Sequence, residues 1–295
     1  MTVVGSAPSV RPSSWFGSDG WQQTATLQLL DLAVDVHSDD PALLALVDTL
    51  YAPTRVDRPA DHALFVGRIR VGADAGWFAA ADGGVLVRTP APGIAFRHLV
   101  YEANQMAIDA TAAAVRLHAG AVAAAGRAVA LVGPMGAGKS TLAAGLVVRG
   151  FEYLTDEVVA VDADGRVRPY AKPCSLGEPP ATLAVPAWTP PPGSFPYLGG
   201  SGLVPAAVLG AVAGAPAPLG AVVLPSYRRD AATAITELAP ADALVDVAAH
   251  AFGLSEPGAL AALHDVIGAV PCFRLVSGDL DAACDAIESV TGAIA

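Results

Sequence analysis

Apolar and polar positions in the first part of the chain alternate in short runs, separated by Gly and Asp turn signals. One run has helical spacing instead, with Leu99, Ala103 and Ala107 on one face. The expected elements are, in order, a strand over 22–36, a helix over 42–50 capped by the acidic residues before it, strands over 62–70, 76–80 and 84–88, and a long helix over 96–115. They predict a small α+β N-terminal domain over residues 21–112.

The second part of the chain, residues 113–295, begins with two apolar runs that meet at Gly126 and predict a hairpin. The expected elements are hairpin strands over 117–125 and 127–132, a helix over 141–148, a strand pair over 153–161 and 166–169, a strand over 220–224, helices over 240–251 and 257–267, a strand over 272–276 and a helix over 280–290. This succession of strands and helices is typical of the α/β class.

Two segments lack periodicity. Residues 1–20 are rich in Gly, Ser and Pro and are expected to form a flexible tail. Residues 175–205 contain dense proline and glycine. A structureless segment of this length inside a domain is typical of a lid, a binding loop or disorder, and we expect a substrate-facing loop.

The junction between the second hairpin strand and the next helix carries the complete pattern G-x-x-x-x-G-K-[ST]. Its glycines allow backbone N–H groups to converge on phosphates, and the helix directs its positive end at them. Lys139 is expected to reach the β- and γ-phosphates, and Ser140 to bind Mg²⁺. The expected nucleotide-binding residues are Gly133, Pro134, Met135, Gly136, Ala137, Gly138, Lys139, Ser140 and Thr141.

An accidental match to a glycine-rich turn is the alternative. The required strand and helix flank the motif, however, and the chain contains only two lysines, Lys139 and Lys172. A chain that otherwise uses arginine but keeps lysine here is expected to need a compact ammonium group at this point.

Composition limits the classes of function. With 53% hydrophobic and 15% charged residues, the 295-residue chain can form a sizeable core. The net charge of −11, without a Lys/Arg cluster, argues against a nucleic-acid partner. Apolar runs are too short for a transmembrane helix and no signal peptide pattern is present, so a cytoplasmic protein without a membrane partner is expected. The three cysteines lack metal-ligand spacing and are expected to be packing residues.

Two adjacent acids, Asp156 and Glu157, interrupt the apolar run 153–161. Beside a phosphate loop, such carboxylates can bind Mg²⁺ or accept a proton from an attacking hydroxyl. The alternative is a solvated strand end. The predicted metal ligands are therefore Ser140, Asp156 and Glu157.

Four further residues are candidates for the site, and each also has a simpler structural interpretation. His118 opens the first hairpin strand, where a core histidine is the simpler interpretation. Lys172 either pairs with a phosphate or with a carboxylate of the substrate, or is an exposed cation before proline. Arg228 and Arg229 either face a transferred phosphoryl group or belong to a solvated turn.

Several of these segments together resemble the HPr kinase/phosphorylase family, and more closely the HPr-kinase-like serine kinases found beside bacterial biosynthetic clusters. The resemblance covers residues 113–295 and rests on the segments 117–122, 133–140, 149–159, 172–176, 222–227 and 272–280. It implies a P-loop kinase domain with a twisted mixed sheet like that of phosphoenolpyruvate carboxykinases, and it implies ATP and Mg²⁺ as cofactors. In the family pattern Asp156 matches the catalytic base and Glu157 the second acid.

Two differences separate the chain from true HPr kinases. Glu157 stands where they have aspartate, and their Glu-Ile-Arg-Gly-Leu-Gly segment has no counterpart here. HPr is therefore not the expected substrate.

These observations predict an ATP- and Mg²⁺-dependent kinase that phosphorylates a hydroxyl, most simply a Ser or Thr of a peptide or small protein. The catalytic residues would be Asp156 as base, Lys139 and the loop as charge neutralisers, His118 as an orienting group, and Glu157. A nucleotide-sensing module without chemistry is the alternative. A homo-oligomer, a phosphorylase back-reaction and the identity of the acceptor are left open.

Overall fold

The structure, a computed structural model, describes residues 20–69, 76–82, 84–177, 183, 185, 188–198, 202–209 and 214–292. The expected tail over residues 1–20 lies outside this part except for residue 20, and so does much of the middle of the segment 175–205. The chain divides into two compact units. One contains Met1–Ala110 and Thr189–Ser201, and the other contains Thr111–Trp188 and Gly202–Ala295.

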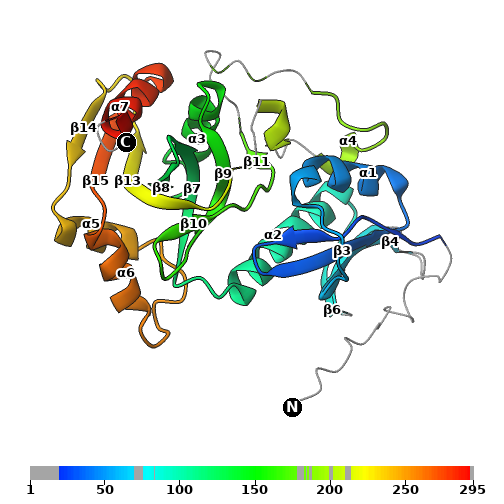
Figure 1. The fold of residues 1–295 in the computed structure, drawn as a ribbon. Coiled ribbons are helices and arrows are strands. Elements are labelled where there is room, and N and C mark those ends of the chain that lie inside the picture. Colours follow the sequence, from blue (N-terminus) through cyan, green and yellow to red (C-terminus); the bar gives the residue numbers. More distant parts are fainter. Residues whose placement is uncertain are drawn as a thin grey trace. The chain divides into compact units, whose positions relative to one another are not determined.

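The first unit is an α+β unit built on one mixed sheet (Figure 1). Its elements are β1 (Gln22–Gln23), β2 (Leu27–Leu29), β3 (Leu32–Ser38), α1 (Pro41–Leu50), the 3₁₀ turn η1 (Ala52–Thr54), β4 (His62–Ile69), β5 (Gly76–Ala81), β6 (Gly84–Thr89), α2 (Pro92–Ala110) and α4 (Phe195–Leu198). The strand order is β1-β3-β4-β5-β6, and β2 pairs with β3. Strands β3 and β4 are parallel because α1 connects them, and the other pairs are antiparallel.

Several expectations for this unit are confirmed. Helix α1 begins where expected, with the Asp40 carboxylate accepting a hydrogen bond from the Ala42 N–H at 2.9 Å. Strands β4, β5 and β6 match their predicted ranges closely.

Two expectations for this unit are wrong in their bounds. The single strand over 22–36 is three short strands, because the chain reverses between β2 and β3 at Leu30, whose φ is +54°. The long helix begins four residues earlier than expected, with proline in the first turn, where its missing N–H costs nothing. It ends at Ala110, and Val115 already belongs to a strand.

The second unit contains a seven-stranded mixed sheet in the order β10-β9-β7-β8-β13-β15-β14. Its elements are β7 (Val115–Ala124), β8 (Arg127–Val132), α3 (Lys139–Val148), β9 (Glu152–Val161), β10 (Arg166–Arg168), β11 (Cys174–Ser175), β12 (Leu203–Val204), the 3₁₀ turn η2 (Ala206–Leu209), β13 (Ala217–Tyr227), β14 (Ala234–Glu237), α5 (Pro240–Ala248), α6 (Ala259–Gly268), β15 (Cys272–Ser277) and α7 (Leu280–Gly292). The α/β class is confirmed.

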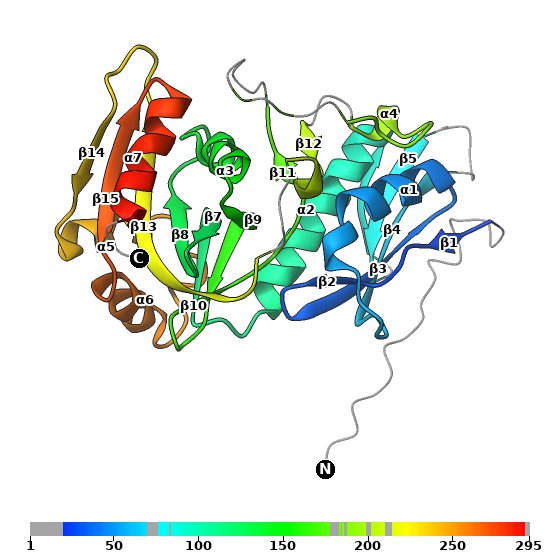
Figure 2. The ribbon, with the colours of Figure 1, turned by 45° about the horizontal axis from the view of Figure 1, so that its top comes forward.

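The sheet is strongly curved. The long strand β13 runs parallel to β8 and β15, and its first residues also pair with β10, which itself pairs with β9. The sheet therefore curls until β10 bridges two strands that are three places apart in the strand order, and Figure 2 shows the bend of β13. The predicted hairpin of β7 and β8 is confirmed, with positive φ at both turn residues, Ala125 and Gly126.

Alternating side chains of the central strands bury into two separate clusters. In β8, Val129 and Leu131 pack with α3 and α7, whereas Ala128, Ala130 and Val132 pack with α5 and α6. Helices therefore cover both faces of the sheet (Figures 1 and 2). The three cysteines are buried and free, as the sequence predicts.

The prolines and glycines of 175–205 do not form one structureless loop in the part that the structure describes. Strands β11 and β12 pair antiparallel near the two ends of this segment, and Thr189–Ser201, expected in the second domain, is counted with the first unit. Searching the described residues, we found no helix long and apolar enough to cross a membrane.

Candidate functional site

The phosphate loop lies at the end of β8, the middle strand of the seven, and leads directly into α3. Gly136 and Gly138 have φ values of +81° and +93°, a conformation that glycine adopts without strain. The Ala137 N–H donates to the Pro134 carbonyl at 3.2 Å, which closes the turn. A Cβ added at Gly136 would have no neighbour within 4 Å, so the loop faces open space.

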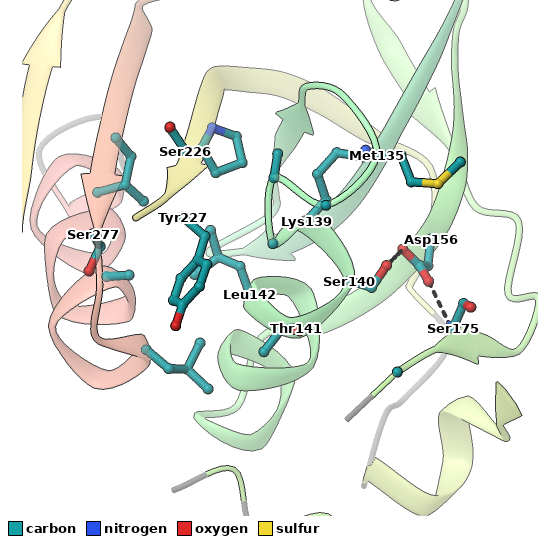
Figure 3. A pocket seen from close by; sticks show the side chains of 18 of the residues that line it. Met135, Lys139, Ser140, Thr141, Leu142, Asp156, Ser175, Ser226, Tyr227 and Ser277 are labelled. Atoms are coloured by element: carbon teal, nitrogen blue, oxygen red, sulfur yellow. Dashed lines mark hydrogen bonds between the residues drawn. The ribbon is translucent and has the colours of Figure 1, made fainter. Parts of the chain in front are cut away.

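A cavity of about 780 Å³ lies over this loop, and the described residues that line it all belong to the second unit. The loop residues from Met135 to Thr141 line it, together with His118, Asp156 and Glu157. Figure 3 shows the Asp156 and Tyr227 side chains on opposite sides of the loop. The structure thus brings every predicted catalytic residue to one cavity.

Lys139 is folded back onto its own loop. Its side chain is 8% exposed, and Nζ donates to the carbonyl oxygens of Gly133 at 2.7 Å and Pro134 at 3.0 Å. Burial lowers the pKa of Lys139 from its ordinary value. The ammonium group is therefore held at the loop by neutral carbonyls, which a phosphate oxygen can replace.

His118 Nε2 lies 3.3 Å from Lys139 Nζ. Burial, and next the charge of Lys139, lower the pKa of His118, so the neutral ring is favoured and its Nε2 can accept from the ammonium. The main chain of His118 is tied at 2.7 Å to the carbonyl of His250, and its ring packs edge-on against Phe252. His118 therefore contacts Lys139. The sequence did not predict this contact.

Asp156 is the most enclosed acid of the site, with only 3% of its surface exposed. Its Oδ1 accepts from the Ser140 hydroxyl at 2.8 Å, and its Oδ2 accepts from the Ser175 N–H at 2.8 Å. Figure 3 marks both bonds. Strand β9 thus presents a carboxylate directly to the phosphate-loop hydroxyl, through residues 16 positions apart in the sequence.

Glu157, the next residue, has a strained backbone. Its φ is +130°, a region that non-glycine residues rarely adopt and that costs on the order of 1–3 kcal/mol. Its carboxylate is held by Lys172, whose Nζ lies 2.6 Å from Glu157 Oε2 and also donates to the Asp156 carbonyl at 2.8 Å. Lys172 is only 1% exposed. This lysine therefore holds both members of the acid pair.

At Lys172 the structure excludes the exposed cation of one alternative, and the carboxylate that it contacts belongs to Glu157 and not to a substrate. Lys172 is a buried cation bonded to the acid pair and not an exposed residue before proline. One indication of this role was present in the sequence, because lysine is rare in the chain and occurs only at positions 139 and 172. Arg228 and Arg229 are exposed and are absent from the described lining of the cavity.

The donor set suits one kind of metal ion. Among the described residues there is no group of three or more His, Cys, Asp or Glu side chains that could hold a metal. Mg²⁺ usually takes one or two protein oxygens and completes its shell with water and phosphate oxygens. The hydroxyl of Ser140 and the carboxylate of Asp156, facing each other beneath the loop, fit that pattern. Glu157, the third predicted ligand, is instead bonded to Lys172.

Comparison with models of known protein families gave no match to this chain, and a search of curated proteins gave no significant match either.

Proposed function

We propose that the second unit is a P-loop kinase domain of the HPr kinase type, which transfers the γ-phosphoryl group of ATP to a hydroxyl with the help of Mg²⁺. The observation that carries this proposal is the 2.8 Å contact between Ser140 Oγ and Asp156 Oδ1 at the foot of the phosphate loop, inside one cavity. A glycine-rich turn that matched the motif by accident would have no reason to place a buried carboxylate there.

The loop and Lys139 would neutralise the phosphates. The loop is open to solvent at Gly136, and the start of α3 adds its positive dipole end. Lys139 would exchange its two carbonyl partners for β- and γ-phosphate oxygens. Because His118 is neutral, it adds no second positive charge and can hold the ammonium during that exchange.

Ser140 and Asp156 would hold the magnesium ion. When bound, the ion would supply positive charge for the oxygens of the transferred group. The Ser175 N–H keeps the Asp156 carboxylate oriented from its other side.

Asp156 would also act as the base. The acceptor oxygen forms a bond to the γ-phosphorus, the bond from that phosphorus to the β,γ-bridging oxygen breaks, and ADP leaves with the electron pair. The acceptor proton passes to Asp156, since each carboxylate oxygen has two lone pairs and Oδ2 uses only one for the Ser175 N–H. Glu157 would act indirectly, since Lys172 joins its carboxylate to the main-chain carbonyl of Asp156.

The acceptor class follows from the resemblance described above. We expect a Ser or Thr hydroxyl in a peptide or small protein, because the HPr-kinase-like serine kinases that the sequence resembles phosphorylate serine.

The experiment is a transfer assay with γ-labelled ATP, Mg²⁺ and serine-containing peptides encoded beside the gene, with phosphoserine located by mass spectrometry. Label should pass to a serine in the presence of Mg²⁺, and Ser140→Ala should reduce the rate. Binding of Mg·ATP without transfer to any peptide or protein would favour a nucleotide-sensing module instead.

A further inference from the structure

The cavity continues well beyond the groups that handle phosphate. On the side away from Asp156 it is lined by Tyr227 at the end of β13 and by the turn that leads from β15 into α7. We propose that this side binds the base of the nucleotide, with the base stacked on the Tyr227 ring. The proposal rests on the proposed function, because it names a second part of the same nucleotide site.

Tyr227 is fixed to the phosphate loop yet leaves its ring open to solvent. Its N–H donates to the Ala137 carbonyl at 3.3 Å, and a Cβ added at Gly138 would lie 3.6 Å from the Tyr227 Cβ. The residue is nevertheless 58% exposed. An aromatic ring that is held at its base and free on its face is what a stacking platform requires.

The chemistry of this side differs from that of the acid side. Its lining is largely apolar, with Leu142, Leu275, Leu280 and Ala283, and the hydroxyls of Ser226 and Ser277 stand among them. Apolar walls with a few polar groups are typical of sites for flat organic ligands and not for phosphate.

The turn beside Tyr227, which follows the neighbouring strand β15, is held by several hydrogen bonds. Ser277 Oγ lies 2.6 Å from Thr233 Oγ1 and donates to the Asp279 carbonyl at 2.7 Å, and the Ser277 carbonyl accepts from the Arg228 N–H at 3.0 Å. Gly278 has no room for a Cβ, which would lie 2.7 Å from the Arg228 carbonyl oxygen. The turn before α7 is therefore bonded to Arg228, the residue after Tyr227. This side of the cavity is thus formed before a ligand binds.

The direction of the bound nucleotide follows from the loop. The transferred phosphoryl group must lie near Asp156, and Lys139 takes the β- and γ-phosphates. The nucleoside end of the triphosphate then leaves the loop on the other side of Lys139, along the first turn of α3. Figure 3 shows the Tyr227 ring beside that turn, with Thr141 and Leu142 close to it.

Stacking on an aromatic ring is usually worth enough to be measured, about tenfold in affinity for one base. The test compares ATP, which has a base, with inorganic tripolyphosphate, which has none, by calorimetry in the presence of Mg²⁺. Tyr227→Ala should weaken ATP binding about tenfold and change tripolyphosphate binding by less than about twofold. Tyr227→Phe keeps the ring and should restore most of the affinity for ATP.

Tyr101 offers a matched control, because it is 59% exposed but belongs to the first unit. Tyr101→Ala should bind both ligands as the parent does. Equal losses for ATP and tripolyphosphate in Tyr227→Ala would mean that Tyr227 only supports the loop, and undiminished ATP binding would mean that the base lies elsewhere; either result overturns the proposal while the phosphate site stands. A parent that binds neither ligand would instead refute the proposed function itself.

Discussion

The two sides of the cavity differ in how their side chains are held. On the acid side, Asp156, Lys139 and Lys172 are each at most 8% exposed, and each has at least two hydrogen-bond partners. On the other side, Tyr227 is 58% exposed and bonded through its main chain. The charged side chains are therefore already held in place where phosphoryl transfer is proposed. At the proposed base site, affinity would depend on the area of contact with the ring.

This division has a physical reason. A displaced charge in a site of low polarity loses much of its interaction energy, so charged groups must be fixed by surrounding bonds. Stacking is tolerant of small shifts because it depends on overlap of faces. Substitutions on the acid side should therefore reduce phosphoryl transfer or phosphate binding, and those on the Tyr227 side should reduce only the affinity for the nucleotide.

The largest effect is expected for Asp156→Asn. This variant keeps the shape of the side chain and can still accept from Ser140, but it removes the proton acceptor. Transfer to a serine peptide should fall on the order of 10²-fold or more, while Mg·ATP affinity stays within about threefold. Transfer by this variant at the parental rate would exclude Asp156 as the base.

Glu157→Gln tests whether the two acids have different roles in transfer. Glu157 is bonded to Lys172 and not to Ser140, so its loss should reduce transfer less than the loss of Asp156 does. The two rates are measured side by side with one peptide. A larger loss for Glu157→Gln would exchange the roles proposed for the two acids.

The next effect concerns nucleotide affinity. Lys139→Ala removes the ammonium group from the loop and should weaken Mg·ATP binding by at least about tenfold, or 1.4 kcal/mol. Calorimetry measures the affinity, and circular dichroism checks that the variant is folded. A folded variant with parental affinity would contradict the phosphate-loop assignment.

A smaller effect on stability is expected at Lys172. Lys172→Met keeps the buried stem but leaves Glu157 without its cation, and the free energy of unfolding should fall by about 1–2 kcal/mol. This is less than for a fully buried pair, because the Glu157 side chain is 40% exposed and water can solvate it. Denaturant unfolding measures the change. Arg274→Met, which breaks the exposed pair with Asp246, is the matched control and should change stability by less than about 1 kcal/mol.

The smallest effect is a pH dependence at His118. Its pKa in the folded protein lies below the ordinary value of 6.5, so the folded state binds fewer protons than the unfolded state. The contribution of the neutral His118 to the free energy of unfolding is therefore fully present above pH 6.5 and is lost as the pH falls below that value. Its charged neighbours are Lys139, His250, Glu157 and Asp156, and the acids oppose the shift.

Melting temperatures at about pH 7.5 and pH 5.5 test this dependence. His118→Gln should lose less stability over that interval than the parent. His264→Gln, at a side chain that is 70% exposed, is the control and should follow the parent. Equal pH dependence in all three proteins would show that His118 does not contribute.

Local sequence patterns were sufficient to predict most of the helices and strands. The Asp40 cap marked the start of α1, the junction at Gly126 marked the β7–β8 hairpin, and the pattern of the phosphate loop marked the β8–α3 connection. These features depend on neighbouring residues alone, so the sequence contains their causes. The strand β14 and the split of 22–36 into three strands were missed, because their pairing partners supply the stabilisation.

By itself, the sequence determined that the pattern of a phosphate loop joins a strand to a helix and that Asp156 and Glu157 interrupt an apolar strand. Only the tertiary structure decided which of the two acids faces Ser140, that Lys172 is buried against them, and that Tyr227 stands across the loop. Each of these contacts joins strands or turns that are distant in the chain. Their geometry is set by the register of β9 beside β7 and by the curvature of β13, and no local spacing specifies either one.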